Sequence, residues 1–157
     1  PLDRLRARTH LDRTPHGPPT MNTTKPTVYI ASAYTKGDVA VNVRFQCRIF
    51  DFLLTTGKVL PYAPLMSHFQ HALYPRPYAD WIAYDLAMLP LFDACLRLDA
   101  TDDRLPGYCQ SESSGADGEV AEFTRMGKPV FYDTPSLLAW ADAKLAPDLD
   151  DLIRCGR

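Results

Sequence analysis

The apolar residues of the chain are concentrated in four short segments, which are separated by longer and partly polar ones. The first segment, TVYIASAY, is apolar on both faces, as a strand buried in a parallel sheet should be. Pro61 and Pro64 limit the second segment, VLPYAPL, to a short strand. The predicted strands are therefore 27–34, 59–65, 95–99 and 128–132.

The longer segments carry apolar residues at helical spacing. In the first, Val41, Phe45, Ile49, Phe52 and Leu53 form a stripe along one face, which predicts an amphipathic helix. The predicted helices are 39–58, 79–94, 116–127 and 134–145.

Capping residues fit several of these helix ends. Asp38 is a plausible N-cap, and Gly57 stands where a helix ends in a left-handed residue. Thr134 is the expected N-cap of the last helix, with Pro135 at its first helical position.

Two segments around the second predicted helix lead to further expectations. Residues 66–78 contain two prolines, which predicts an irregular lid or loop. Within the helix, the side chains expected to face a core are Trp81, Ile82, Leu86 and Leu89.

Strands that alternate with helices indicate a parallel sheet covered on both faces. We therefore predict a single three-layer, doubly wound α/β domain with a mainly parallel sheet, of the flavodoxin or Rossmann kind. The domain is expected at 25–147, between an N-terminal extension at 1–24 and a tail at 148–157. Ligands of such sheets bind beyond the carboxyl ends of the strands.

Composition narrows the class of protein. The 157 residues are 46% hydrophobic, which suffices for one core, and the net charge of -2 argues against a nucleic-acid partner. No apolar run approaches the roughly 18 residues that span a membrane. The four cysteines are scattered without a CxxC spacing, which disfavours zinc and a disulfide framework. We expect a reduced, cytoplasmic protein.

The first twenty residues combine arginines and prolines without the apolar stretch of a secretory signal. Two aspartates count against a transit peptide. Met21 begins a segment that reads like a natural start. We expect residues 1–20 to be a disordered extension or the product of an overextended gene start.

A long polar loop precedes the third predicted helix. Ser111, Ser113, Ser114 and Gly115 lie at its end, and a helix N-terminus attracts phosphate through its unpaired N–H groups. No GxxxxGK[ST] motif occurs, which excludes P-loop chemistry. The alternative is that Ser114 caps the helix and that nearby carboxylates merely favour its dipole.

Two carboxylates near this loop are further candidates for a functional site. Glu119 lies in the helix that follows the loop, and Asp85 lies on the preceding helix, where it could point into the same crevice. Two neighbouring carboxyl groups protonate differently, which suits acid and nucleophile roles at a glycosidic carbon. Asp93, at a helix-to-strand junction, is expected to be a local cap.

Three segments carry a family resemblance: VYIASAY at 28–34, DLAMLPLFDACLRLD at 85–99, and LPGY followed by SSGADGEVAEFTRMGKPVFY within 105–132. In order and spacing, the chain resembles the nucleoside 2-deoxyribosyltransferase-like superfamily over about residues 27–145. This superfamily includes the 2'-deoxynucleoside 5'-monophosphate N-hydrolases and an uncharacterised phage and bacterial group close to them.

The resemblance implies a set of catalytic residues. Glu119 follows Gly115 by four positions, as the nucleophile of the family does. Tyr29 matches the tyrosine that steadies this nucleophile, and Asp85 matches the aspartate that contacts the base or sugar. Ser113 stands where the monophosphate hydrolases have serine and the transferases tend to have aspartate, which favours a ligand with a 5'-phosphate.

The substrate-binding residues implied with these are Ser113, Ser114, Gly115, Ser32, Tyr34 and Ala31. Ala31 and Ser32 stand where the family usually has glycine, so the mouth of the pocket is expected to be narrower or to form other hydrogen bonds. Tyr34, Tyr78 and Tyr84 are candidates to stack on a base.

The implied reaction is hydrolysis of the N-glycosidic bond of a (deoxy)nucleoside 5'-monophosphate, without a metal or organic cofactor, by a homodimer or larger homo-oligomer. A base in place of water would make the same site a transferase. Two other functions remain open: a non-catalytic nucleotide-binding module, and a flavodoxin-like protein that binds FMN or a phosphosugar. His68 and His71 could also coordinate a metal together with Asp80, although isolated pairs of histidines usually do not.

Overall fold

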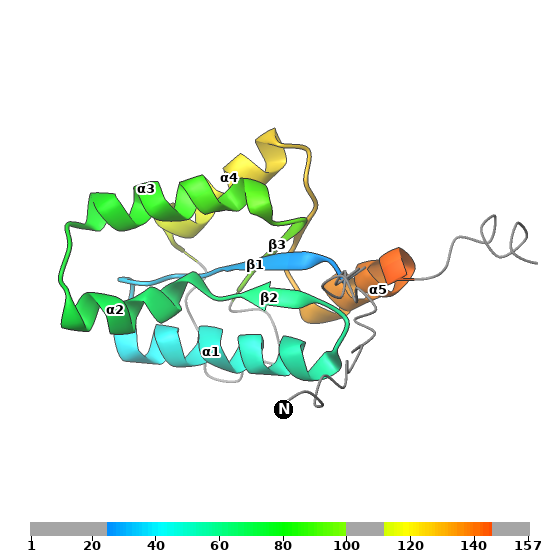
Figure 1. Ribbon diagram of the computed structural model, residues 1–157, viewed down its shortest axis with the longest axis horizontal. Helices are drawn as coiled ribbons and strands as arrows, with labels where there is room; N and C mark the ends of the chain where they lie inside the picture. Colours follow the sequence, from blue (N-terminus) through cyan, green and yellow to red (C-terminus); the bar gives the residue numbers. More distant parts are fainter. Residues whose placement is uncertain (1–24, 100–111, 146–157) are drawn as a thin grey trace, which may run out of the picture.

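The structure, a computed structural model, describes residues 25–99 and 112–145. Its elements, drawn in Figure 1, are β1 (Thr27–Ala31), α1 (Val39–Thr56), β2 (Leu60–Tyr62), the 3-10 turn η1 (Pro64–Met66), α2 (Ser67–Leu73), α3 (Tyr78–Met88), the 3-10 turn η2 (Leu89–Leu91), β3 (Ala94–Arg97), α4 (Ser114–Arg125), β4 (Val130–Phe131) and α5 (Thr134–Leu145).

The strands form one parallel sheet in the order β2-β1-β3-β4. β1 pairs with β2 on one side and with β3 on the other, so that Tyr29 lies between Tyr62 and Cys95. The chain therefore reverses its winding direction between β1 and β3. The prediction of an α/β domain with a parallel sheet is confirmed, and this reversal is where such sheets bind ligands.

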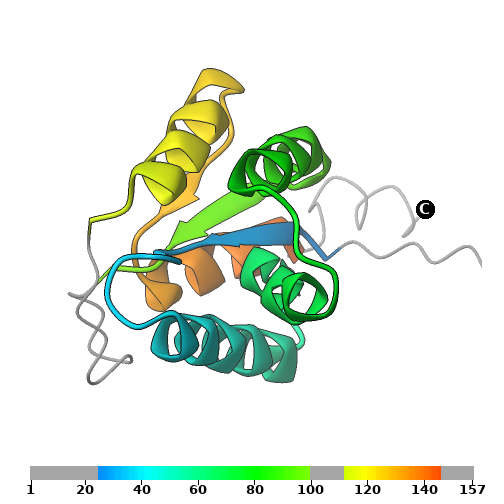
Figure 2. The same cartoon turned by 90° about the vertical axis from the view of Figure 1, so that its left-hand side faces the viewer.

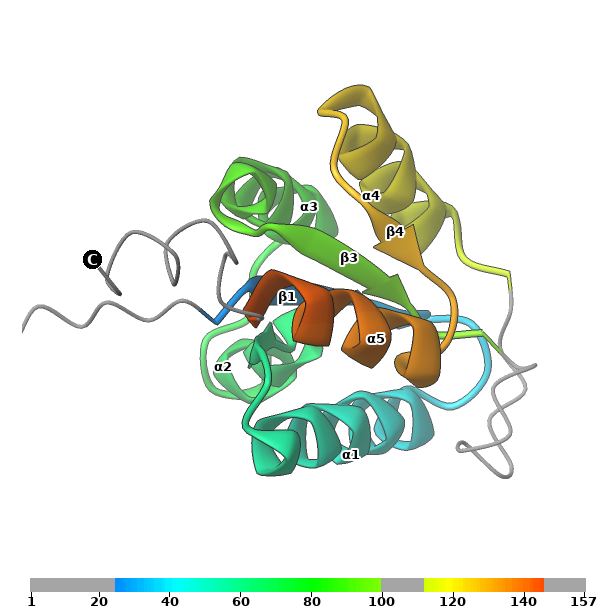
Figure 3. The ribbon, with the colours of Figure 1, turned by 90° about the vertical axis from the view of Figure 1, so that its right-hand side faces the viewer.

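Helices cover both faces of the sheet, with α1 and α5 on one face and α3 and α4 on the other (Figure 1, Figure 3). Because side chains alternate along a strand, Val28 and Ile30 pack with residues of α1 and α5, such as Leu53 and Leu137. Tyr29 and Ala31 pack toward the other face, with Leu89, Cys95 and Phe123 among their neighbours. The domain thus has two cores, one on each side of the sheet.

The predicted caps are only partly correct. Asp38 accepts a hydrogen bond from the Val41 N–H at 3.1 Å, and Gly57 is left-handed with φ 68°. Thr134, however, lies inside α5. Asp133 performs the capping instead, since its carboxylate accepts hydrogen bonds from the Ser136 N–H at 2.7 Å and from the Ser136 hydroxyl at 2.8 Å.

The structure also corrects the expectations for residues 66–78 and for the helix after them. The predicted irregular lid contains η1 and α2, which lead directly into α3. None of the α3 residues is fully buried, and Leu86 is 42% exposed instead of facing a core. Trp81 and Ile82 line a cavity, whereas Leu89, directly after the helix, is completely buried in the core as expected.

None of the described helices is both long enough and apolar enough to cross a membrane. The predictions for residues 1–24 and 148–157, and most of the polar loop that includes Ser111, lie outside the described residues.

Candidate functional site

A cavity of about 410 Å³ opens at the carboxyl ends of β1 and β2 and at the head of α4, within the range of small-molecule sites. Figure 2 looks onto this end of the sheet, with α2, α3 and the head of α4 arranged around the end of β1. The lining residues are Ser32, Tyr34, Thr35, Lys36, Pro64, Leu65, Ser67, His68, His71, Arg76, Tyr78, Trp81, Ile82, Asp85, Ser113, Ser114, Gly115, Ala116 and Glu119.

Glu119 is the most buried carboxylate of the cavity, with 8% of its surface exposed. The Tyr29 hydroxyl, which is completely buried, donates a hydrogen bond of 2.7 Å to Glu119 Oε1. The Tyr29 ring is held among the rings of Tyr62, Phe92 and Phe123. The hydrogen bond expected between Tyr29 and Glu119 is therefore present, and it fixes the direction of the carboxylate.

Asp85 contributes a second carboxylate to the same cavity. Among the described residues, its buried Oδ1 atom has no hydrogen-bond partner. Leaving such an atom unpaired is costly. Atoms of this kind are expected to gain a partner when a ligand or water occupies the site.

The carboxyl groups of this site titrate near neutrality. Burial raises the pKa of Glu119 to about 7; the hydrogen bond from Tyr29 and the charge of Arg97 oppose this rise, and the charge of Asp85 adds to it. Burial also raises the pKa of Asp85 to about 6. Burial and the charge of Glu119 raise the pKa of Tyr29, so its hydroxyl stays protonated. Groups poised in this way can exchange protons during catalysis.

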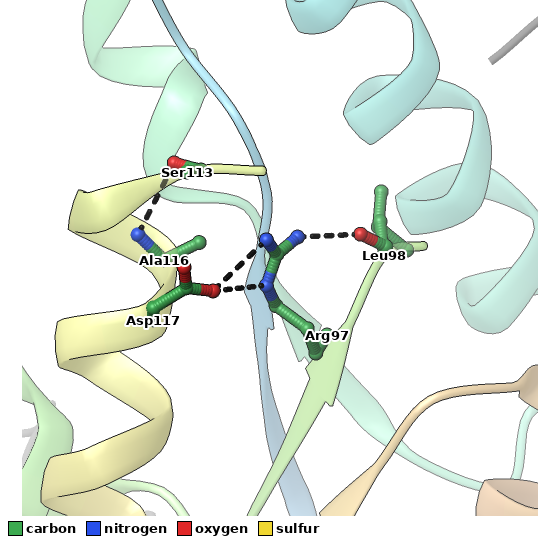
Figure 4. Close-up of polar contacts among 5 residues, drawn as sticks. All are labelled: Arg97, Leu98, Ser113, Ala116 and Asp117. Carbon is green, nitrogen blue, oxygen red and sulfur yellow. Dashed lines mark hydrogen bonds and ion pairs between the residues drawn. The ribbon is translucent and has the colours of Figure 1, made fainter. Parts of the chain in front are cut away.

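The head of α4 is tied to the end of β3 by a buried arginine (Figure 4). Arg97, which is 3% exposed, forms an ion pair of 3.1 Å with Asp117 Oδ1 in the first turn of α4, and its Nη1 donates to the Leu98 carbonyl at 2.6 Å. Ser113 caps the helix, accepting from the Ala116 N–H at 3.3 Å. The N-cap is thus Ser113 rather than Ser114.

Gly115 allows α3 to approach α4 closely. A Cβ atom at this position would lie 3.3 Å from the Tyr78 hydroxyl and 4.0 Å from Ile82 Cδ1. This glycine therefore sets the spacing between the two helices at the cavity wall.

The sequence did not predict that α2 and the start of α3 form one wall of the cavity. His68 Nδ1 lies 3.0 Å from the Tyr34 hydroxyl. His71 Nδ1 accepts hydrogen bonds from Trp81 Nε1 at 3.0 Å and from the Arg76 N–H at 3.3 Å. Had a helix been predicted here, the spacing of His68 and His71 would have placed both side chains on one face of it.

The structure gives no support to the metal site considered for His68, His71 and Asp80. Across residues 25–99 and 112–145, no group of three or more potential metal ligands is found. The Nδ1 atoms of both histidines are instead engaged in hydrogen bonds within the wall.

Most of the predicted site residues are brought together. Glu119, Asp85, Ser113, Ser114, Gly115, Ser32 and Tyr34 line the cavity. Ala31 does not, because its side chain is completely buried in the core beside Tyr29. Of the aromatic candidates for base stacking, Tyr34 and Tyr78 line the cavity, whereas Tyr84 lines an adjoining groove beside α2.

Comparison of the chain with protein-family models, with curated proteins and with solved structures gives no significant match.

Proposed function

We propose that this protein hydrolyses the N-glycosidic bond of a (deoxy)nucleoside 5'-monophosphate. The observation that carries the proposal is Glu119, which lines the same cavity as Asp85 and accepts a hydrogen bond of 2.7 Å from the buried Tyr29 hydroxyl. A carboxylate held in one direction beside a second carboxyl group is the arrangement that glycosidic chemistry uses. The resemblance to the nucleoside 2-deoxyribosyltransferase-like superfamily supports the same reaction.

In the proposed mechanism, the Glu119 carboxylate attacks the anomeric carbon while the bond to the base breaks. The electron pair of that bond leaves with the base, which takes a proton from Asp85. Water then attacks the glycosyl-enzyme ester at the same carbon and gives a proton to the Asp85 carboxylate, while Glu119 leaves as a carboxylate. The sugar 5-phosphate is released and Asp85 is protonated again. Tyr29 orients Glu119 throughout.

The head of α4 suits the 5'-phosphate. Ser113, Ser114 and Gly115 line the cavity at this helix terminus, where the dipole and the N–H groups favour an anion. The Ser113 hydroxyl oxygen accepts from the Ala116 N–H, so its proton remains for donation. Lys36 and Arg76 also line the cavity and add positive charge.

The experiment that tests the proposal is a screen of deoxynucleoside and ribonucleoside monophosphates for release of free base, followed by chromatography. Replacing Glu119 by Gln should reduce the rate about a thousandfold or more, since it removes the nucleophile. Glu122→Gln is the matched control on the same helix, because Glu122 pairs with Arg125 at 2.6 Å outside the cavity. A Glu119→Gln variant that turns over at the wild-type rate would contradict the mechanism.

The same screen separates the rival functions. Exchange of an added base into the product would indicate a transferase. Nucleotide binding without any base release would indicate a sensing module, and a yellow protein with bound FMN would indicate a flavodoxin-like role.

We further propose that the protein forms a homodimer or larger homo-oligomer in the cytoplasm. Large apolar side chains on α2 and α3 are exposed in the single chain, including Phe69 at 58%, Leu73 at 73% and Tyr84 at 50%, and clusters of this kind mark interaction surfaces. Sedimentation analysis of the purified chain tests this, and a monomer at micromolar concentration would contradict it.

A further inference from the structure

Ser32 is the first residue after β1, and it occupies a position between the core and the cavity. It is only 7% exposed, yet it lines the cavity. Its hydroxyl oxygen accepts a hydrogen bond of 2.8 Å from Gln46 Nε2. A buried side chain therefore determines whether the Ser32 hydroxyl donates or accepts toward the cavity.

Gln46 is completely buried in α1, and its orientation is determined by two backbone groups. Its Oε1 accepts from the Leu65 N–H at 2.8 Å, and its Nε2 donates to the Ile30 carbonyl at 2.8 Å. A flipped amide would place oxygen against oxygen and N–H against N–H. Since neither backbone group can reverse its role, the second N–H of Nε2 must point at Ser32.

A serine hydroxyl has one proton and two lone pairs. Gln46 occupies a lone pair of Ser32, and no acceptor for the Ser32 proton is found among the hydrogen bonds of the described residues. A ligand group that only donates would leave this proton unpaired in a nearly buried position, which is costly. A ligand group that accepts satisfies it.

We propose that Ser32 is a specificity-determining residue, which donates a hydrogen bond to a ligand oxygen that carries no proton of its own, and that Gln46 is the positioning residue which holds Ser32 in this donor state. The identity of the ligand as a nucleotide rests on the proposed function. A nucleotide offers such oxygens on its phosphate and as carbonyl groups on its base.

The experiment measures the binding of a deoxynucleoside monophosphate and of the corresponding nucleoside by calorimetry, in a Glu119→Gln background so that the ligand is not consumed. Ser32→Ala should weaken binding of the monophosphate about tenfold. If the affinity for the nucleoside is unchanged, the acceptor is a phosphate oxygen; if it falls equally, the acceptor is a base carbonyl. Unchanged affinity for both ligands would overturn the proposal.

Ser67→Ala is the matched control, because Ser67 also lines the cavity but has no comparable contact with a buried amide among the described residues. Its effect should be smaller than that of Ser32→Ala, and an equal effect would overturn the special role of Ser32. Thermal unfolding of both variants verifies that they are folded.

Gln46→Glu tests the positioning role. A glutamate at this completely buried position is expected to be protonated. Its one proton is needed by the Ile30 carbonyl, so it can only accept toward Ser32; the Ser32 proton would turn inward, and monophosphate binding should weaken about as much as in Ser32→Ala. Because both changes remove the same donor, the double variant should be no weaker than either single variant. A further loss in the double variant would show that Gln46 acts structurally and would overturn its assignment.

Binding and turnover distinguish this inference from the proposed function. Monophosphate binding that is insensitive to Ser32→Ala overturns the inference alone. Base release that is insensitive to Glu119→Gln overturns the mechanism alone. If no nucleotide binds the unaltered protein, both are overturned.

Discussion

Two aspartates only eight positions apart in the sequence, Asp85 and Asp93, lie at opposite ends of the sheet and have opposite environments. Asp93 lies where β3 begins. Its Oδ2 accepts hydrogen bonds from the Thr27 N–H at 2.8 Å and from the Thr27 hydroxyl at 2.9 Å, and its own N–H donates to the Thr27 carbonyl at 3.0 Å. Asp85 lies at the cavity with a buried oxygen that has no hydrogen-bond partner among the described residues.

The difference separates a carboxylate whose contacts stabilise the fold from one to which we assign a role in catalysis. Asp93 joins the start of β1 to the start of β3, and its hydrogen bonds stabilise the fold without any ligand. Burial of Asp85 makes its charged form less stable. Its buried Oδ1 atom forms no hydrogen bond with the described residues that would offset this cost. Such a cost is typical of functional sites. The predictions that follow test this contrast.

The largest expected effect is on catalysis. Asp85→Asn should reduce base release about a hundredfold, because general acid catalysis contributes factors of about 100 to 10,000. Asp93→Asn, the matched control, should leave the rate unchanged. The measurement is kcat/KM for the monophosphate that the screen shows to be the best substrate. Equal losses in the two variants would contradict the different roles assigned to Asp85 and Asp93.

The pH dependence of kcat/KM tests the assignment of Asp85 as the general acid more closely. With pKa values of about 6 for Asp85 and about 7 for Glu119, kcat/KM should be highest between these values, as the joint behaviour of a coupled pair. Asp85→Asn should remove the decline on the alkaline side, because no acid then needs to stay protonated. A decline that persists in the variant would assign the acid to another group.

Stability should depend on pH through the cavity carboxylates. The pKa of Glu119 is raised in the folded state from 4.5 to about 7, so the protonated form favours folding. This contribution is complete below about pH 4.5 and is lost as the pH rises through 7, at a cost of at most about 3 kcal/mol. Chemical denaturation from pH 4.5 to 8 should show this decline, and Glu119→Gln should reduce it. An equal decline in the variant would contradict the assignment.

A smaller effect on stability is expected at the other end of the sheet. Asp93→Ala removes the hydrogen bonds to Thr27 and should lower the free energy of unfolding by about 1–2 kcal/mol, with unchanged base release. Urea denaturation measures it. Loss of activity in a folded Asp93→Ala protein would show that the two ends are coupled.

The smallest expected effect is that of Tyr29→Phe. The ring remains among its aromatic neighbours, but the hydrogen bond that lowers the pKa of Glu119 is lost. Because the pKa of Glu119 already lies above that of Asp85, the alkaline limb of the kcat/KM profile should move to higher pH, and the rate near neutrality should fall about tenfold, as expected for one lost hydrogen bond to a charged group. A profile with an unmoved limb would show that Tyr29 does not tune Glu119.

The fold was predictable from the sequence because alternation of apolar strands and amphipathic helices is a property of many residues together. Boundaries were less predictable. The first strand was expected to run to Tyr34, but β1 ends at Ala31, and the residues after it leave the sheet to line the cavity. Nothing in an apolar run marks the point at which pairing stops.

The site was predictable to the extent that short motifs determine it. The spacing of Gly115 and Glu119, read through the resemblance, located the head of α4. Gln46 and Arg97 were missed, because a polar residue within a helical or strand pattern looks the same whether it is exposed or buried with partners. Those partners, Leu65 and Asp117, are defined only by tertiary packing.

The bond between Tyr29 and Glu119 joins residues 90 positions apart, and this has a consequence for how the molecule matures. Early chain segments can fold around β1 during synthesis, yet none of them contains a working pocket until α4 has docked. Closing so long a segment is slow compared with forming local helices. If the cavity binds a ligand, as proposed, the rate of ligand capture during refolding should report the docking of α4.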